Sequence, residues 1–295
     1  MRVIQRTYSN CLIALLFCLL AGASAVADQD VGGKSKHLTL VIPFVKIRDP
    51  TDTNYFYVAL LDLALSKTVA QDGPYELVHM PNYLGTERMR LMLEQGAGVD
   101  ILWSTSNRQR ENRFLAVPVD LLRGLNAYRA LLIDEKRVAE FEHIKSIDDL
   151  KRFRVGSGDH WQDTQVLKHN ELPLVGFLDY ETMMPMLKFR RFDYASRGLH
   201  EVWKELEYSE GFIIAPNVLL HYKLPVHYFV RKNNHALADR IYRGLVKTIE
   251  DGSYYELFYN VPSHKYGYNQ FKKMNSVVIE LENPNATIKP HMITP

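Results

Sequence analysis

Apolar residues recur along residues 38–103 with two periods, and the two periods alternate. Short apolar runs, typical of strands, are separated by longer segments in which apolar residues recur every three or four positions, as on one face of a helix. The clearest helical face comprises Tyr57, Leu60, Leu61, Ala64, Leu65 and Val69. The predicted elements are a strand over 38–43, a helix over 54–71, a strand over 75–80, a helix over 85–95 and a strand over 99–103. This alternation favours a mostly parallel sheet covered on both faces.

A second series of strands and helices follows residue 127. Its predicted strands cover 153–156, 192–194 and 212–215, and its predicted helices cover 161–169, 183–188, 199–206 and 237–249, with a short helical turn at 148–150. We expect Pro216 to close the strand before it, because proline has no N–H to donate. Two extended apolar runs, 127–134 and 226–230, are interpreted as connections between two lobes. The tail over 283–295, rich in proline and asparagine, predicts coil.

The N-terminal segment is typical of a secretory leader. Two arginines precede an apolar run over 11–20, and small residues up to Ala27 fit a cleavage site. We expect residues 1–27 to be removed as a signal peptide during export to the periplasm. Cleavage removes both cysteines, Cys11 and Cys18, so the mature chain has no disulfide, thiol nucleophile or thiolate metal site.

The charge of the chain is balanced. Its 36 basic and 34 acidic residues give a formal net charge of +2. This balance argues against a general binder of nucleic acid or of anionic membranes, so we expect contact with a membrane only through a partner. The roughly 270 residues left after cleavage are enough for two medium-sized domains, each with its own core.

Several short motifs occur in a specific order. They are Val99-Asp100-Ile101 followed by Ser104-Thr105-Ser106 and an arginine, Asp149-Leu150-Lys151 before Val155-Gly156, Arg191-Phe192-Asp193, and the closing helix over 237–252. In this order the chain resembles the type II periplasmic solute-binding proteins, in the branch that includes the amino-acid-binding proteins of ABC transporters (family 3). It looks closest to a divergent group with the patterns Gly-Asp-x-Trp-x-Asp-Thr and Arg-Phe-Asp-Tyr-x-x-Arg-Gly.

The resemblance implies an α/β fold of two lobes, each a mixed sheet flanked by helices, with a ligand cleft between them. Residues 36–125 and 226–295 would form the first lobe, and 126–225 the inserted second lobe. Ligand binding would close the lobes, and an ABC permease or a membrane sensor would respond to the closed state. We therefore expect a monomeric protein that binds a small carboxylate-bearing solute, amino-acid-like or an organic acid, without a cofactor.

The resemblance also indicates which first-lobe residues bind the ligand. In amino-acid binders an arginine after the Ser/Thr-rich turn pairs with the ligand carboxylate. Arg110 or Arg108 would do so here. The distance from the apolar run at 121–122 favours Arg110, whereas the distance from Phe114 favours Arg108, and we expect Arg110. The turn itself offers hydroxyl and backbone N–H donors, although its residues also suit N-capping. The remaining first-lobe candidates are Ser104, Thr105, Ser106 and the loop residue Tyr83.

The second-lobe candidates surround a glycine-containing turn between a predicted strand and a helix. Glycines there allow a close backbone approach to a ligand, and N–H groups at a helix start favour an anion. The candidates are Gly158, His160, Trp161, Asp163 and Thr164. The turn lacks the Gly-Lys-Ser/Thr ending of a phosphate-binding P-loop, which excludes a nucleotide site of that kind.

Arg197 departs from the family pattern, in which an acidic residue near this position holds the ligand ammonium. If Arg197 faced the cleft, the site would prefer a ligand with two acidic groups or without an ammonium. Alternatively, Arg197 pairs with Glu201 four residues later on the helix.

Two other classes of function remain open at the sequence level. The first is a dehydratase-like enzyme on the same fold, with Asp159, His160, Asp163 and Glu201 as acid–base candidates. The second is an interaction module whose cleft binds no ligand. The eleven histidines are scattered without metal-binding spacing, so no metal site is expected.

Overall fold

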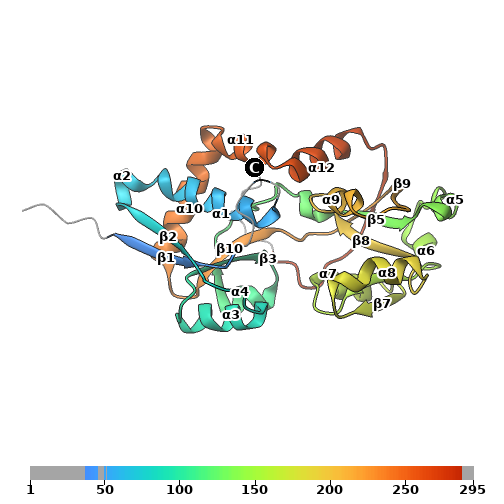
Figure 1. The fold of residues 1–295 in the computed structure, drawn as a ribbon, viewed down its shortest axis with the longest axis horizontal. Coiled ribbons are helices and arrows are strands. Elements are labelled where there is room, and N and C mark those ends of the chain that lie inside the picture. The colour runs from blue at the N-terminus through green and yellow to red at the C-terminus, as the bar shows by residue number, and fades with distance from the viewer. Residues whose placement is uncertain (1–36, 46–49, 51, 288–295) are drawn as a thin grey trace, which may run out of the picture. The chain divides into compact units, whose positions relative to one another are not determined.

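Strands and helices alternate through the chain, which this computed structural model describes over residues 37–45, 50 and 52–287 (Figure 1). The leader expected over 1–27 and both cysteines lie outside these residues. No helix within the described ranges is long and apolar enough to cross a membrane.

The strands of the described residues are β1 (Leu38–Ile42), β2 (Tyr75–His79), β3 (Ile101–Thr105), β4 (Phe114–Ala116), β5 (Tyr128–Asp134), β6 (Val155–Gly158), β7 (Leu174–Phe177), β8 (Tyr194–Gly198), β9 (Phe212–His221), β10 (Val226–Arg231) and β11 (Val277–Glu280). The α-helices are α1 (Thr53–Ser66), α2 (Val69–Asp72), α3 (Thr86–Gln95), α4 (Arg108–Arg113), α5 (Val138–Phe141), α6 (Ile147–Leu150), α7 (Gln162–His169), α8 (Met183–Lys188), α9 (Val202–Glu207), α10 (His235–Glu250), α11 (Ser253–Asn260) and α12 (Pro262–Lys273). Single 3₁₀ turns cover Leu125–Ala127, Glu135–Arg137 and Tyr180–Thr182.

Five strands form the first lobe. β1 and β2 are parallel, while β10 lies antiparallel between β3 and β4. Hydrogen bonds between Val41 and Asp100 join the two groups of strands, with Val41 N–H donating to the carboxylate at 2.7 Å. The mostly parallel sheet predicted for this part is therefore wrong, because a strand from far along the sequence, β10, enters it antiparallel.

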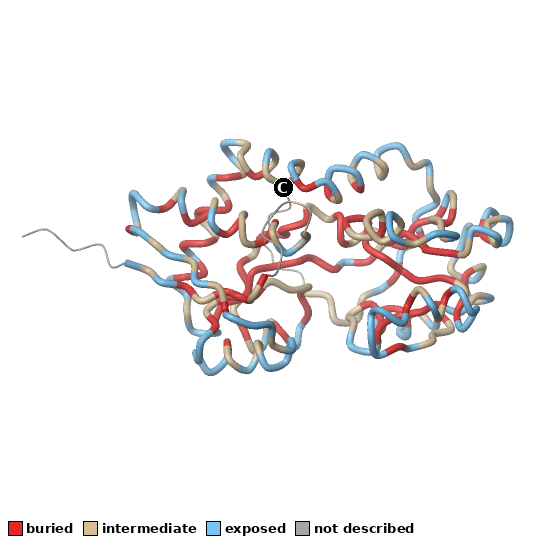
Figure 2. The backbone as a smooth tube through the Cα atoms, viewed as in Figure 1, coloured by how far each residue is buried: buried red, intermediate tan, exposed pale blue. Residues whose placement is uncertain are grey.

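Six strands form the second lobe in the order β11-β9-β5-β8-β6-β7. The sheet is mixed, since β5 is antiparallel to β8 and β9 while β6 is parallel to its neighbours. The central strands β5 and β10 are buried along nearly their whole length (Figure 2). They lie inside the sheets, so the interpretation of 127–134 and 226–230 as connections is wrong. The chain passes between the lobes just before each strand.

Pro216 does not end its strand, contrary to the sequence-based expectation. β9 continues to His221, and its register against β5 shifts between Ala130 and Leu132. The irregularity contains Pro216 and Asn217, which has φ 61°. A bulge tolerates proline because the ladder hydrogen bonds are already interrupted there.

The C-terminal elements of the chain belong to both lobes. α10 and α11 pack on α1, whereas α12 packs on α9 and β11 pairs in parallel with β9. The sequence grouped all of 226–295 with the first lobe, but the pairing of β11 places residues 277–280 in the second sheet. After β11 the backbone returns to the first lobe, where the Arg108 N–H donates to the Asn285 carbonyl at 3.2 Å.

Close helix packing anchors the first lobe. Phe56, Leu60 and Ala64 of α1 are fully buried against α10 and α11. Gly244 of α10 lies so near α1 that a Cβ there would be 2.1 Å from the Ala64 carbonyl oxygen. The absence of a side chain at this position is thus a packing requirement.

Candidate functional site

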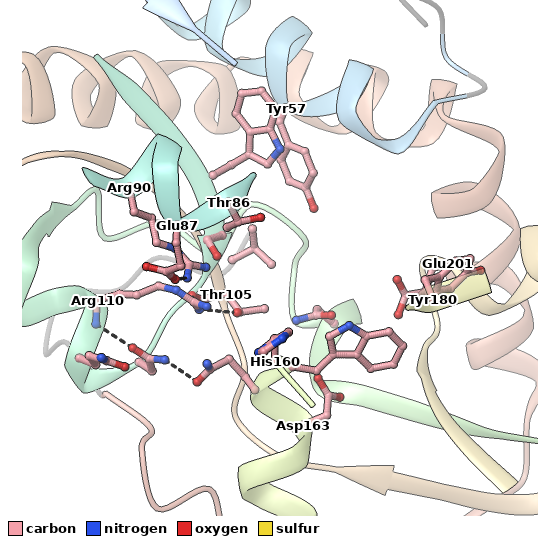
Figure 3. A pocket seen from close by; sticks show the side chains of 18 of the residues that line it. Tyr57, Thr86, Glu87, Arg90, Thr105, Arg110, His160, Asp163, Tyr180 and Glu201 are labelled. Atoms are coloured by element: carbon pink, nitrogen blue, oxygen red, sulfur yellow. Dashed lines mark hydrogen bonds and ion pairs between the residues drawn. The ribbon is translucent and has the colours of Figure 1, made fainter. Parts of the chain in front are cut away.

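A cavity of about 950 Å³ is lined by residues of both lobes. α3, β3 and α4 supply one wall, and β5, α7, β8 and the residues just after β8 supply the other (Figure 3). A hydrogen bond joins the two sides, from the Asn107 amide next to α4 to the Gln162 side-chain carbonyl of α7. The cavity therefore lies at the boundary between the lobes.

Arg110 is the buried cation of the first-lobe wall. Asn107 caps α4 by accepting the Arg110 N–H at 2.7 Å, and the Arg110 guanidinium donates to the Thr105 hydroxyl at 2.7 Å (Figure 3). The residue is only 8% exposed, its Nε has no hydrogen-bond partner, and it forms no ion pair with any described carboxylate. Burial, reinforced by the charge of Arg90, lowers the pKa of Arg110 to about 10. At neutral pH it remains a cation, and the carboxylate that favours its charge, Glu87, is already paired with Arg90.

Two further arginines flank Arg110 but are already neutralised. Arg90 pairs with Glu87, and Arg113 pairs with Glu94 at 2.9 Å and with Glu87 at 3.6 Å. We call these five residues, Arg110 included, the arginine wall. It contains three arginines and two glutamates, which leaves one positive charge unbalanced.

Arg129 of β5 organises the opposite wall. Its guanidinium lies 2.7 Å from Asp163 and 3.6 Å from Glu201, and Asp163 also accepts a hydrogen bond from the Tyr222 hydroxyl at 2.5 Å. Burial alone would raise the pKa of Glu201, but Arg197, His200 and Arg129 outweigh it and hold this pKa at about 2. Glu201 is therefore an anion at neutral pH.

Arg197 lines the cavity, yet its charge is already balanced. Its Nε lies 3.0 and 2.9 Å from the two Glu205 oxygens, and its Nη2 lies 3.2 Å from Glu201. The guanidinium also lies 4.6 Å from the Trp161 ring centre. Although burial opposes the charge, Glu201 and Glu205 raise the pKa of Arg197. The expected Glu201 partner is present, but the stronger partner, Glu205, was missed.

The second-lobe wall thus has an excess of negative charge. It contains two arginines and three carboxylates, namely Arg129, Arg197, Asp163, Glu201 and Glu205, and we call these residues the acidic wall. The arginine wall has one positive charge in excess and the acidic wall one negative charge, to which the nearby lining residue Asp179 adds another, so the cavity is electrically bipolar.

Two buried histidines lie near the acidic wall, and one of them, His200, also lines the cavity. Burial lowers the pKa of His200 to about 4, and burial also lowers that of His264 to about 3. Neither ring nitrogen of His264 has a hydrogen-bond partner, and its ring packs 4.6 Å from Phe56 and 4.8 Å from Phe258. Both histidines are neutral at pH 7.

Eight of the twelve residues selected from the sequence line this cavity: Tyr83, Ser104, Thr105, Arg110, His160, Trp161, Asp163 and Arg197. The other four do not line it. Arg108 is exposed at the first turn of α4, and the buried Ser106 donates its hydroxyl to Glu111 at 2.6 Å. Gly158 lies under the Trp161 ring, and Thr164 donates to the Gly158 carbonyl at 2.6 Å.

The sequence-based search missed several residues of the cavity. Arg129 and His200 were not considered, and Tyr180, Glu87 and Arg90 had no motif to identify them. The clearest available signal was Arg129 itself, since an arginine inside a buried apolar strand requires a partner. Glu201 was named only as an ion-pair partner of Arg197 and as an acid–base candidate.

Comparison with known proteins identifies the fold. No protein-family profile and no curated protein matches the sequence. Among solved structures, an ancestral arginine-binding protein bound to arginine is 19% identical with a TM-score of 0.55, over 75% of this chain and 96% of that one. A probable amino-acid ABC transporter extracellular-binding protein from Bacillus subtilis is 18% identical with a TM-score of 0.58, over 77% and 100%.

A third solved structure extends the range of functions found on this fold. A histidine kinase sensor domain with similarity to periplasmic binding proteins is 15% identical with a TM-score of 0.56, over 76% of this chain and 96% of that one. The chain therefore has the two-lobed fold of the type II periplasmic binding proteins, with a cleft between its lobes, as the motifs predicted. Identities this low establish the fold and not the ligand.

Proposed function

We propose that this protein is an extracytoplasmic solute-binding protein that captures a small zwitterion, such as an amino acid, in the cavity between its lobes. The observation that carries the proposal is Arg110, a buried cation in the cavity wall that forms no ion pair with any described carboxylate. Leaving such a charge unpaired is costly, so a site of this kind favours an anionic group on its ligand.

The geometry supports a two-point mode of binding. The ligand carboxylate would accept hydrogen bonds from the Arg110 guanidinium, beside the Thr105 hydroxyl. The ligand ammonium would face the acidic wall, where the Glu201 side chain is 29% exposed. Its Oε2 accepts no hydrogen bond from the described residues and lies 3.8 Å from the His200 Nε2. This mode replaces the doubly anionic ligand expected from Arg197, because Glu205 and Glu201 already neutralise that arginine.

Both walls must approach the same ligand, which couples binding to closure of the lobes. A ligand that contacts both walls stabilises the closed state by its differential affinity for that state. A membrane partner, either an ABC permease or a sensor, would respond to this closure. The expected periplasmic location agrees with the leader-like N-terminus and with the binding proteins and sensor domain that share the fold.

The contacts favour binding over acid–base catalysis. Asp163 is engaged by Arg129 and Tyr222, and Glu201 by Arg197. Asp159, another acid–base candidate, does not line the cavity. A catalytic acid or base would need a proton that it can exchange near neutral pH, whereas these carboxylates are held by ion pairs.

Isothermal titration calorimetry tests the proposal on the mature protein, with separate panels of amino acids, dicarboxylates and monocarboxylates without an ammonium. We expect a ligand among the amino acids. Arg110→Ala should weaken that ligand by about 2–4 kcal/mol, which is roughly 30-fold or more, because a charge-assisted pair is lost. Arg108→Ala is the matched control, since it removes an exposed arginine two residues away and should leave the affinity unchanged.

Two results would contradict the assignment. The zwitterion is wrong if the hits are dicarboxylates and no amino acid binds. The role of Arg110 is wrong if Arg110→Ala, shown to be folded by circular dichroism, retains the wild-type affinity for every ligand found.

A further inference from the structure

A second concave site lies on the second lobe, at the end of the sheet opposite the ligand cavity. It has a volume of about 470 Å³ and is lined by Arg154, Pro185, Met186, Phe189, Arg190 and Arg191. We call these six residues the basic groove. β6 and β8 run in parallel, and their first residues follow Arg154 and Asp193, whereas the ligand cavity begins where these strands end. The basic groove is therefore separate from the ligand site.

Unbalanced positive charge concentrates at this groove. Arg154 is 3.5 Å from Asp193, which also pairs with Arg137 at 2.7 Å. In contrast, Arg190 and Arg191 of the groove, and Lys188 next to it in the chain, are exposed and form no ion pair with any described carboxylate. The positive charge of these three residues, which lie within four consecutive positions, is larger than the formal net charge of the whole chain, +2. A local surplus of this kind attracts an anionic partner.

The same segment exposes an aromatic ring. Phe189 is 75% exposed although the neighbouring Leu187 and Phe192 are fully buried. An exposed phenylalanine between cations keeps an apolar ring in water and contributes nothing to the core. Aromatic and arginine side chains, by contrast, are the residues that dominate protein interfaces.

The backbone at the groove is held in a strained conformation. α8 ends with Arg190 in the left-handed region, φ 56°, a position usually filled by glycine. The Arg190 N–H donates to the Leu187 carbonyl at 3.0 Å, the Arg191 N–H donates to the Met186 carbonyl at 2.9 Å, and Arg154 donates to the Arg190 carbonyl at 2.9 Å. Strain of this sort is commonly kept where a side chain has a function.

We propose that the basic groove docks an acidic segment of a partner protein. Guanidinium groups bind carboxylates through two parallel hydrogen bonds, which suits a peptide with glutamate or aspartate side chains. The concave shape and the Pro185 and Met186 lining add an apolar contact for a neighbouring side chain. A flat membrane surface would not use this concavity, so we favour a peptide over an anionic bilayer.

Fluorescence anisotropy tests the docking site on the full mature protein. The probe is a fluorescein-labelled peptide of alternating glutamate and leucine, and the comparison peptide has lysine in place of glutamate. We expect binding of the acidic peptide alone, weakened by added salt. The double variant Arg190→Glu with Arg191→Glu should lose roughly tenfold or more in affinity. Lys265→Glu with Lys273→Glu is the control, since it makes the same charge change on exposed positions of α12.

Arg190→Gly separates a binding role from a structural one. If Arg190 serves the fold, its loss lowers the melting temperature. If it serves a partner, glycine relieves the left-handed strain, so the melting temperature stays or rises while peptide affinity falls. The Arg110→Ala variant should bind the acidic peptide as the wild type does, which keeps this test independent of the proposed ligand.

Three results would overturn the proposal. They are absence of peptide binding, equal loss of affinity in the control variant, and binding to phosphatidylglycerol vesicles without binding to the peptide. The last result would assign the groove to an anionic membrane instead.

Discussion

Mild acid should destabilise this protein through two buried histidines. His200 and His264 are 9% and 0% exposed, and burial lowers their pKa values to about 4 and about 3. In the unfolded chain the same rings titrate near 6.5. Between pH 6.5 and 4 the unfolded state therefore binds protons that the folded state does not bind, and stability falls as the pH falls.

The size of the effect follows from the two pKa values of each ring. A pH of 5 is about 1.5 units below the pKa of histidine in the unfolded chain, which corresponds to about 2 kcal/mol for each ring. Lowering the pH from 8 to 5 should thus remove about 4 kcal/mol through these two residues. The pKa of His200 already contains the effect of the charged groups around it. These groups are Glu201, Arg129, Arg197 and Asp163.

The variant His264→Leu isolates one of the two contributions. Its ring packs between Phe56 and Phe258 without a hydrogen bond, so leucine suits the site. Between pH 8 and 5 the variant should lose about 2 kcal/mol less than the wild type. For a protein of this size that difference is about 4–8 °C in melting temperature. Contributions from other groups, such as the buried Asp120 whose pKa is raised by burial, cancel in the comparison.

Urea unfolding followed by circular dichroism at pH 8, 6 and 5 measures the difference. His143→Leu, a change at an exposed position, is the control and should keep the wild-type pH dependence. If His264→Leu and the wild type lost the same stability between pH 8 and 5, His264 would not be a buried neutral ring, and the reasoning would fail.

Two further predictions concern packing and the C-terminal segment. Gly244→Ala should destabilise the protein by about 1–3 kcal/mol because its Cβ would overlap the Ala64 carbonyl, whereas Gly85→Ala, with no atom within 4 Å of a Cβ, should be nearly neutral by thermal unfolding. Asn170→Ala should cost about 1–2 kcal/mol in urea unfolding by removing two hydrogen bonds to the Glu282 backbone, at 2.8 and 3.1 Å, and a wild-type midpoint would count against a structural role for that segment.

Strong periodicity explains which elements could be predicted from the sequence. The helix predicted over 54–71 has six apolar residues on one face, and the structure has α1 and α2 over 53–72, interrupted at residues 67–68. β8 was placed too early because Tyr194-Ala-Ser-Arg-Gly contains polar residues although the whole strand is buried. Its Arg197 is balanced there by carboxylates that lie later in the chain, of which the spacing in the sequence indicated Glu201 but not Glu205.

The sequence predicted eight residues that line the cavity but not the ion pairs that set its charge. The distance to the apolar run at 121–122 favours Arg110 over Arg108, and Asn107 as the N-cap of α4 places residue 110 at the third helical position. No pattern brings Arg129, Asp163 and Glu201 together, since they belong to three separate elements. The electrical asymmetry of the cavity depends on these long-range pairs and emerges only from the fold.

The pairing of β11 with β9 has a consequence for dissecting this protein. An isolated fragment of residues 126–225 would lack β11 and the α12 cover of α9, leaving the β9 edge open to strand pairing between copies. The second lobe is therefore not an autonomous folding unit as it is encoded. A fragment in which residues 262–287 are joined to the end of residues 126–225 should be soluble. During biosynthesis the sheet is complete only after the last residues of β11 have been added.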